Sequence, residues 1–311
     1  MPIVAKDSNP VDLSIVIVSY NTQAILRQCL QSVRACHGDL HVQVFVVDNA
    51  SIDGSPDMVE EEFPEVELIR NKINVGFAKA NNQALRKVTG THILLLNSDV
   101  VLGADTIAKT LKYMQSHPQV GVVTCKLILP DGRLDLACRR SFPTPFVALW
   151  RLVGLSRLFP RSKTFAQYNL TYLDEDTTYE VDAVVGAYML MTREAFMEVG
   201  LLDESFFMYG EDLDWCYRFR QAGYGVVYYP EAVARHHKGA SSLGRKPYRM
   251  VREFHRAMEL FYRKYFAKKY FIALNWIVYA GIYGHFGFNF LQSKLYSLTA
   301  RNKEVASRLT L

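Results

Sequence analysis

The sequence predicts an α/β fold in which a mostly parallel central sheet is flanked by helices. Strand-like and helix-like segments alternate between residues 14 and 96, and the strand-like ones are near-continuous runs of valine, isoleucine and leucine. Such runs are typical of parallel strands that are covered on both faces. A third observation concerns polar residues, which directly follow three of these strands. Sheets of this kind bind their ligands beyond the carboxyl ends of the strands.

The first elements follow from residue periodicity. A run of isoleucine and valine predicts a strand over 14–19. Apolar residues then recur with helical spacing from Ile25 to Val33, behind Thr22, a residue type that often caps a helix. The same reasoning predicts further strands over 42–47, 66–70 and 92–96, and helices over 55–63 and 77–87.

The second half of the chain is less regular. Residues 143–178 show little periodicity and predict a helix and loops of their own, whereas 181–191 returns to strand-like composition. A helix is expected over 211–222, closed by Gly223, and a short strand over 226–229. We therefore expect a main domain over 1–240 and a C-terminal helical region over 241–311.

The C-terminal region contains a charge-free stretch at 271–291, which carries aromatic residues, two asparagines, a histidine and three glycines. Its length of about 20 residues matches a bilayer crossing. Its aromatic and polar content is more typical of an amphipathic helix lying in the membrane interface. We expect the interfacial helix, with a single membrane-inserted span and a core helix as the alternatives.

Charge is unevenly distributed, although the net charge is only +5. No acidic residue lies between Leu136 and Leu173, and nine basic residues between Arg245 and Lys269 face only two glutamates. The basic residues of the first stretch are Arg139, Arg140, Arg151, Arg157, Arg161 and Lys163. Because aromatic and aliphatic residues interleave with them, an anionic membrane surface is the expected partner. Nucleic acid is not expected, because no nucleic-acid-binding module is recognisable.

Cysteine usage and the N-terminus indicate the compartment. The five cysteines form no Cys-x-x-Cys pair, which argues against a zinc site and a disulfide framework and for reduced core thiols. Lys6, Asp7 and Asp12 interrupt any apolar stretch that would make a signal peptide. The expected location is the cytoplasm, peripheral to the inner face of the cell membrane.

Three groups of residues are candidates for chemistry. Asp99 stands at the end of an apolar strand, where its carboxylate could hold a hard cation such as Mg²⁺, although Asn-Ser-Asp is also ordinary turn chemistry. Asp212 lies in a run of acidic residues that opens a helix, behind an apolar loop able to desolvate a carboxylate and raise its pKa. His236 could complete a cation shell begun by Asp99, and a structural role for it stays open.

Five ordered motifs strongly resemble the family-2 glycosyltransferases, and within them the rhamnosyltransferases and galactofuranosyltransferases. The similarity spans roughly residues 13–240. The motifs are Ser19-Tyr20-Asn21, Val46 to Ser51 with Asp53-Gly54-Ser55, Asn74 to Ala78 with Asn81-Asn82, Leu94 to Asp99, and Gly210 to Asp214. The resemblance implies a GT-A (nucleotide-diphospho-sugar transferase) fold. It also implies an inverting glycosyltransferase that uses Mg²⁺ or Mn²⁺ and a nucleotide-diphosphate sugar donor.

The resemblance also assigns roles to residues. Asp212 matches the catalytic base, and Asp99 and His236 match cation ligands. Glu211 and Trp215 are implied to contact the acceptor, a glycan or a lipid-linked oligosaccharide of the cell envelope. The residues implied to bind the donor are Ser19, Tyr20, Asn21, Asp48, Asn49, Gly76, Asn81, Asn82, Asn97 and Ser98.

One position departs from the pattern. Asn97 stands where many relatives carry the first aspartate of the D-x-D motif, so the protein should hold the cation more weakly and leave more of its shell to diphosphate and water. By resemblance dTDP-rhamnose is the first donor expected, and UDP-linked sugars come next. The alternatives are a catalytically inactive scaffold of envelope assembly and, less favoured, a sugar-phosphate nucleotidyltransferase, whose glycine-rich loop is missing. The sequence has no G-x-G-x-x-G motif after its first strand, which argues against an NAD-binding protein.

Overall fold

A central β-sheet organises the molecule. The computed structural model describes residues 10–238 and 248–309. The sheet has nine strands in the order β3-β2-β1-β4-β8-β6-β9-β5, with β7 paired to β9. The strands are β1 (Leu13–Ser19), β2 (Val42–Asp48), β3 (Glu67–Arg70), β4 (His92–Asn97), β5 (Val100–Leu102), β6 (Val120–Ile128), β7 (Tyr179–Glu180), β8 (Tyr188–Thr192) and β9 (Gly225–His236).

The sheet has a parallel half and a mixed half. Strands β3, β2, β1 and β4 all run in parallel. Strand β8 is antiparallel to both β4 and β6, and β6 and β9 pair in parallel again. The residues of β1 are almost completely buried, as expected of a parallel strand that is covered on both faces. The predicted α/β architecture is confirmed.

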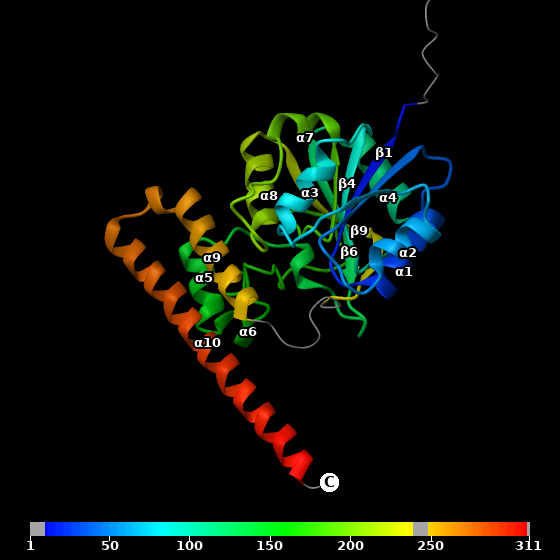
Figure 1. Ribbon diagram of the computed structural model, residues 1–311. Coiled ribbons are helices and arrows are strands. Elements are labelled where there is room, and N and C mark those ends of the chain that lie inside the picture. The colour runs from blue at the N-terminus through cyan, green and yellow to red at the C-terminus, as the bar shows by residue number, and fades with distance from the viewer. Residues whose placement is uncertain (1–9, 239–247, 310–311) are drawn as a thin grey trace, which may run out of the picture.

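Helices cover both faces of this sheet (Figure 1). Helices α1, α2 and α4 lie on one side, and α3, α7 and α8 lie on the other. The helices are α1 (Gln23–Cys36), α2 (Ser55–Glu62), α3 (Phe77–Leu85), α4 (Thr106–Ser116), α5 (Pro145–Leu152), α6 (Leu155–Leu158), α7 (Arg193–Val199), α8 (Glu211–Gln221), α9 (Tyr248–Tyr265) and α10 (Ile272–Leu309). Two short 3₁₀ turns lie at Leu136–Cys138 and Ala267–Lys269.

Three local expectations need correction. The strand expected over 181–191 begins only at Tyr188, because residues before it leave the sheet and Ala183 pairs with Arg140 instead. The strand expected over 226–229 continues to His236, since the register shifts beside Cys125 and the pairing with β6 resumes. Thr22 precedes α1 without capping it, because its backbone (φ −136°, ψ 32°) lies outside the extended region that a capping residue adopts. Its hydroxyl donates to Ser98 Oγ at 3.1 Å instead.

The C-terminal helices extend the molecule on one side (Figure 1). Phe261 and Tyr262 of α9 belong to the main core, and the hydroxyl of Tyr262 donates to Asn275 of α10 at 2.5 Å. Within the described part of the chain, no helix combines the length and the apolarity that a bilayer crossing requires. The domain boundary expected between residues 240 and 241 lies outside the described residues, as do Arg245 and Lys246. All five cysteines are buried and free, as expected.

Candidate active site

The three polar strand ends meet at one edge of the sheet. The pairing register sets Ser19 of β1 opposite Asp48 of β2, and Val18 opposite Asn97 of β4. Ser19, Asp48 and Asn97 therefore lie side by side where three parallel strands end. The expected convergence of these segments is confirmed.

Two buried oxygens at this edge lack hydrogen-bond partners within the described structure. The Oδ2 atom of Asp48 accepts from the Ser51 amide at 3.0 Å, but its Oδ1 atom has no partner. The Oδ1 atom of Asn97 is also buried and unpaired. Because an unpaired buried acceptor costs free energy, two of them at one strand edge indicate a place where a ligand with hydroxyl or amide donors would fit.

Hydroxyl and amide groups surround these oxygens. The Ser19 and Thr22 hydroxyls lie 3.0 Å apart, and Thr22 connects them to Ser98. Asn21 adopts a left-handed backbone with φ of 52°, and its side chain accepts from the Ile52 amide at 2.8 Å. Tyr20 is 41% exposed beside them, free to stack on a flat ring.

Asn49 holds the neighbouring loop in shape. It accepts from the Val75 amide at 3.0 Å and donates to Asn74 Oδ1 at the same distance. The next residue of that loop, Gly76, has a φ of +91°, and a Cβ atom there would lie only 2.5 Å from the carbonyl oxygen of Phe207. Only glycine fits this close approach, which joins the loop before α3 to the loop before α8.

The two adjacent asparagines of α3 differ in their partners. Asn82 is buried and exchanges hydrogen bonds with the Leu202 backbone at 2.9 and 3.1 Å, so both ends of its amide are committed and we leave it out of the proposed donor site. Asn81 donates to the Phe77 carbonyl at 2.9 Å within its own helix. Because this bond uses only one group of its amide, Asn81 stays a proposed donor contact.

Asp99 and His236 lie within contact distance, although 137 positions separate them in the chain. Strand β5 pairs with the end of β9, which sets His236 opposite Val100. His236 Nε2 then lies 3.2 Å from Asp99 Oδ1, and the His237 amide donates to the Asp99 carbonyl at 2.8 Å. Two potential cation ligands thus face one another.

A third residue completes this pair on its far side. Asp135 accepts from His236 Nδ1 at 2.8 Å, and its other oxygen accepts from Lys238 at 2.9 Å. Burial lowers the pKa of His236, but the Asp135 and Asp99 carboxylates outweigh it and raise the pKa to about 9. The imidazole is therefore protonated at neutral pH and donates to both carboxylates. Among the described residues, no three carboxylate, histidine or cysteine side chains form a ready-made metal cage.

The first turn of α8 carries the other acidic residues. Asp212 Oδ2 accepts from the Arg140 guanidinium at 2.7 Å, and Oδ1 accepts from the Leu213 amide at 2.7 Å. Burial, with a smaller contribution from the Asp212 carboxylate, raises the pKa of Glu211 to about 8. The Oε2 atom of Glu211 is buried and has no partner in the described structure. The expected desolvated carboxyl of this run is therefore Glu211.

Backbone contacts bring this turn to the strand edge. The Asn97 amide donates to the Ala187 carbonyl at 3.0 Å. A Cβ atom on the preceding residue, Gly186, would lie 3.9 Å from the Cβ atom of Asp212. The backbone of Gly186 and Ala187 thus lies between Asp212 and the end of β4, the strand that leads into Asp99.

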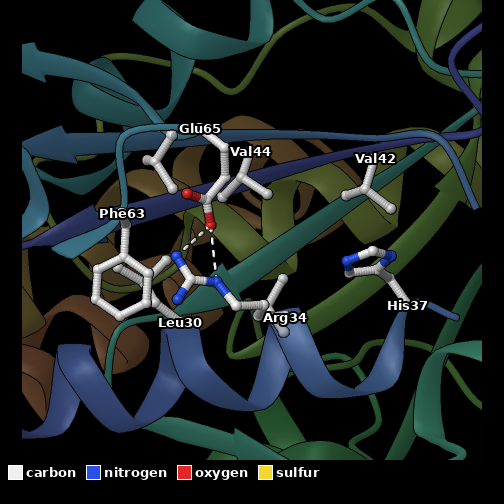
Figure 2. A pocket seen from close by; sticks show the side chains of 9 residues that line it. Leu30, Arg34, His37, Val42, Val44, Phe63 and Glu65 are labelled. Atoms are coloured by element: carbon white, nitrogen blue, oxygen red, sulfur yellow. Dashed lines mark hydrogen bonds and ion pairs between the residues drawn. The ribbon is translucent and has the colours of Figure 1, made fainter.

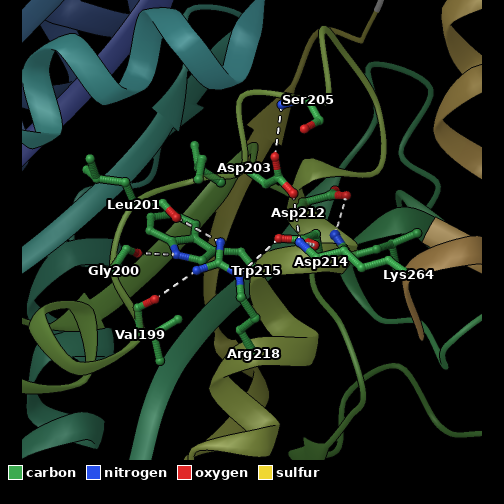
Figure 3. A network of polar contacts seen from close by, with 12 residues as sticks. Val199, Gly200, Leu201, Asp203, Ser205, Asp212, Asp214, Trp215, Arg218 and Lys264 are labelled. Carbon is green, nitrogen blue, oxygen red and sulfur yellow. Dashed lines mark hydrogen bonds and ion pairs between the residues drawn. The ribbon is translucent and has the colours of Figure 1, made fainter. Parts of the chain in front are cut away.

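The opposite side of α8 is structural (Figure 3). Asp214 is fully buried and accepts from Lys264 at 2.5 Å, from the Tyr265 hydroxyl at 2.6 Å and from Arg218 at 3.0 Å. Trp215 is also fully buried, and its indole donates to the Gly200 carbonyl at 2.8 Å. Because this ring lies in the core, we leave Trp215 out of the proposed acceptor site.

A hollow elsewhere on the molecule is unrelated to this edge (Figure 2). It has a volume of about 70 Å³ and lies between α1, β2 and the segment that joins α2 to β3, beside the ion pair of Arg34 and Glu65 at 2.6 Å. Its walls are mostly aliphatic, and none of the residues predicted for chemistry lines it.

Two residues of the site were missed by sequence reasoning. Asp135 belongs to no recognised motif, and Arg140 was assigned to a membrane-facing basic stretch together with Arg139. That assignment is wrong for both arginines, because they are buried: Arg139 donates to the carbonyls of Leu173 and Asp174, and Arg140 pairs with Asp212. One signal in the sequence could have found them: two adjacent arginines lie in a stretch without acidic residues. If such arginines are buried, their partners must come from distant parts of the chain.

Comparison with known proteins identifies the relatives of this chain. Residues 10–255 match the family described as "Glycosyltransferase like family 2". The chain is 28% identical over 260 residues to an N-acetylglucosaminyl-diphospho-decaprenol L-rhamnosyltransferase of Mycobacterium tuberculosis, covering 80% of this chain and 83% of that protein. It is 25% identical over 232 residues to the rhamnosyltransferase WbbL of Escherichia coli K12, covering 72% and 82%.

Solved structures share the fold. The mannosyltransferase PcManGT from Pyrobaculum calidifontis, in complex with GDP-Man and Mn²⁺, superposes with a TM-score of 0.54 at 19% identity, over 83% of this chain and 66% of that one. Residues 1–349 of S. aureus TarS superpose with a TM-score of 0.53 at 14% identity, over 89% and 72%. At these identities the likeness concerns the fold, which is of the GT-A type.

Proposed function

The chain belongs to the glycosyltransferase like family 2 and is a glycosyltransferase, and from this premise we propose which reaction it performs. It transfers a sugar from a nucleotide-diphosphate donor to a hydroxyl group of a glycan or lipid-linked acceptor, with inversion at the anomeric carbon. The observation that carries the proposal is the approach of Asp212 to the strand edge that leads into Asp99 and His236.

Donor recognition is proposed for the edge formed by β2, β1 and β4. The unpaired Asp48 Oδ1 and Asn97 Oδ1 would accept from ribose hydroxyls or base amides, and the exposed Tyr20 ring would stack on the base. Ser19, Asn21, Asn49, Gly76 and Ser98 would shape the same pocket, since they hold its loops and hydroxyl chain together.

A divalent cation fits the pair of Asp99 and His236. A carboxylate oxygen and an imidazole nitrogen face one another at 3.2 Å. This donor set suits Mg²⁺ or Mn²⁺ once the Nε2 proton is released, because only a neutral imidazole nitrogen can bind a cation. Asp135 accepts from the other ring nitrogen of His236, which is how histidine ligands are commonly oriented. When bound, the cation would neutralise the charge that develops on the departing diphosphate. With only two ligands from the protein, the remaining ones would come from diphosphate and water.

Asp212 is the proposed general base. Its carboxylate would remove the proton of the acceptor hydroxyl as the oxygen attacks the anomeric carbon on the face opposite the diphosphate. The bond between that carbon and the diphosphate oxygen breaks, and nucleoside diphosphate leaves. Arg140 holds the carboxylate in place and balances its charge through the 2.7 Å ion pair.

Glu211 is proposed to contact the acceptor. With a pKa raised to about 8, its carboxyl is largely protonated at neutral pH and can donate a hydrogen bond. Its unpaired Oε2 atom lies beside the base, where an incoming sugar hydroxyl would complete the bonding. The two carboxyl groups of this turn would thus take different roles.

L-Rhamnose from dTDP-rhamnose is the first donor proposed, because both relatives named above are rhamnosyltransferases. A lipid-linked acceptor in cell-envelope polysaccharide synthesis is proposed on the same ground, since the mycobacterial relative is named for an N-acetylglucosaminyl-diphospho-decaprenol acceptor. UDP-linked sugars are the second choice of donor.

The test is a transfer assay preceded by a ligand screen. Nucleotide diphosphates and nucleotide sugars are first compared by thermal shift with and without Mg²⁺ or Mn²⁺, because a ligand that prefers the folded state raises the melting temperature. The best donor is then incubated with polyprenyl-diphosphate-linked acceptors, and the anomeric configuration of the product is read by NMR. A product that retains the donor configuration would exclude the single displacement. A protein that is silent with every donor and acceptor would act as a scaffold.

A further inference from the structure

Large exposed hydrophobic side chains gather on two helical segments outside the sheet. Three of them, Phe146, Leu149 and Leu158, lie on α5 and α6, and three more, Trp276, Ile277 and Phe288, lie on α10. We call these six residues the apolar face. On α10 they are 70%, 65% and 64% exposed. Exposed apolar residues that occur singly need no explanation, but a group on adjacent helices indicates a binding surface.

Helix α10 has one side docked on the protein and one side uncovered. On the docked side Asn275 bonds to Tyr262, Tyr279 packs against the Tyr262 ring, and His285 lies 3.0 Å from His255 of α9. On the other side, Trp276, Ile277 and Phe288 have no such cover from the described residues. No charged residue occurs from Phe271 to Gln292, so the uncovered side of this part of α10 is apolar, whereas the docked side carries the polar Asn275 and His285.

The two segments form one surface. Helix α10 runs alongside α5 and α6 in Figure 1, and a Cβ atom on Gly281 of α10 would lie 3.6 Å from the Leu152 side chain at the end of α5. The exposed side chains of α5, α6 and α10 are therefore neighbours rather than two separate patches.

Charge along the two segments that carry the apolar face is mainly positive, and the acidic neighbour Glu259 of α9 accepts from the Tyr283 hydroxyl of α10 at 2.9 Å. No acidic residue occurs between Leu136 and Leu173, and none occurs between Leu260 and Lys303. Arg157, Arg161 and Lys163 are exposed next to α6 and form no ion pair with the described residues. Lys268 and Lys269 precede α10 and are also exposed. An apolar helix side bordered by basic residues matches the boundary between acyl chains and anionic headgroups.

We propose that α5, α6 and α10 together dock this protein on an anionic lipid bilayer, with α10 lying in the plane of the interface. The Trp276, Ile277 and Phe288 side chains enter the acyl boundary, and Arg157, Arg161 and Lys163 contact headgroup phosphates. A second copy of the chain suits this face poorly, because two such faces would bring their basic borders together.

Helix α9 connects the docking face to the turn that carries the proposed base. Helix α9 separates α10 from α8, and a Cβ atom on Gly210, the residue before the α8 turn, would lie 3.3 Å from Ala257 of α9. Delivery of a lipid-linked acceptor to Asp212 rests on the proposed function. Binding to the bilayer does not rest on it, so experiments can contradict the docking and the proposed function independently.

Flotation of the full chain with phospholipid vesicles tests the docking. Vesicles of phosphatidylcholine alone are compared with vesicles that also contain phosphatidylglycerol, at low and high salt. We expect co-flotation with the anionic vesicles, at least tenfold above that with neutral ones, and a decrease as salt rises, because headgroup attraction is screened. Brominated acyl chains should quench the fluorescence of Trp276, measured as the difference from a Trp276→Phe variant.

Matched variants locate the face. Trp276→Ser with Phe288→Ser, and separately Arg157→Glu with Arg161→Glu, should each reduce flotation at least tenfold. Met197→Ser on α7, a residue that is 64% exposed, and Lys112→Glu on α4 serve as controls and should float like wild type. Circular dichroism and donor binding by thermal shift verify that each variant is folded.

Three results would overturn the proposal. Wild-type protein that stays with the soluble fraction on anionic vesicles would exclude docking. Equal flotation of the face variants and the controls would exclude this face. A shift from dimer to monomer in the face variants, seen by light scattering, would assign the surface to a second copy. Loss of transfer to soluble acceptors with flotation intact would instead count against the proposed function.

Discussion

Two acidic groups of side chains in this molecule balance their charges differently. In the first, Asp99 and Asp135 share one protonated imidazole, and the three side chains come from segments that are distant in the sequence. In the second, Glu211, Asp212 and Asp214 follow one another in a single helical turn and recruit separate partners. The first group therefore acts as one unit, whereas each member of the second is set by its own neighbours.

Because of this difference, the acidic residues of α8 have separate roles, some structural and some proposed for chemistry. On α8 the side chain of Asp214 contacts Lys264 of α9, and Asp212 pairs with Arg140. The Oε2 atom of Glu211 has no partner in the described structure. Acidic residues at a helix N-terminus are commonplace, because they complement the helix dipole. Their partners, rather than their positions, separate the proposed base from Asp214.

Replacing the proposed base should have the largest effect. Asp212→Asn keeps an oxygen that accepts from Arg140 but cannot take a proton, so kcat for transfer should fall by about 10²–10⁴-fold. Product formation is measured on protein whose fold is verified by circular dichroism, and donor binding by thermal shift should change little. Near-normal transfer by the folded variant would show that another group is the base.

The same substitution two residues later should act on stability instead. Asp214→Asn weakens the bonds to Lys264, Tyr265 and Arg218 and should lower the free energy of unfolding by about 2–3 kcal/mol. Denaturant unfolding measures the loss, and kcat of the folded fraction should stay within about threefold of wild type. A large loss of kcat without loss of stability would remove the distinction between these two aspartates.

A smaller effect is expected at the first group. Asp135→Asn keeps an acceptor for His236 but removes the charge that orients it, so the affinity for Mn²⁺ should fall by about 10–100-fold. Mn²⁺ binding is titrated by electron paramagnetic resonance in the presence of nucleoside diphosphate. Asp131→Asn, at an exposed turn nearby, is the control. Unchanged Mn²⁺ affinity in Asp135→Asn would assign that residue to packing alone.

The last prediction concerns the pH dependence of stability. The pKa of Glu211 is raised from 4.5 in the unfolded chain to about 8 in the folded one. Between these two pH values the folded state binds a proton that the unfolded state does not. The free energy of unfolding therefore falls as pH rises from about 5 to about 8. Glu211→Gln removes this proton, so its melting temperature should fall less over that range. Glu194→Gln, an exposed residue of α7, should keep the wild-type slope.

Much of the architecture could be predicted from local pattern. Runs of aliphatic residues located β1, β2 and β4, and the polar residues that follow them located the ligand edge, because parallel strands all end on the same side. The contact between Asp99 and His236 also agrees with the expectation, although it was drawn from resemblance rather than from spacing.

The partners of these residues could not be predicted, because they are set by long-range packing. Asp135 and His236 are 101 positions apart, and Arg140 and Asp212 are 72 apart, so no local period links them. For the same reason the sequence predicted Arg139 and Arg140 to be exposed, although both are buried. A motif also does not say whether its residues are buried, so the burial of Trp215 and Asn82 could not be predicted.

The contact between Gly76 and the Phe207 carbonyl has a consequence for engineering. A chimera that exchanged either the half proposed to bind the donor or the half proposed to bind the acceptor would have to preserve this point. In this chain the two halves touch through backbone atoms where even one methyl group would collide. A hybrid that imports any other residue at position 76 would push the segment before α8 outward, so the exchange of halves succeeds only if the glycine travels with them.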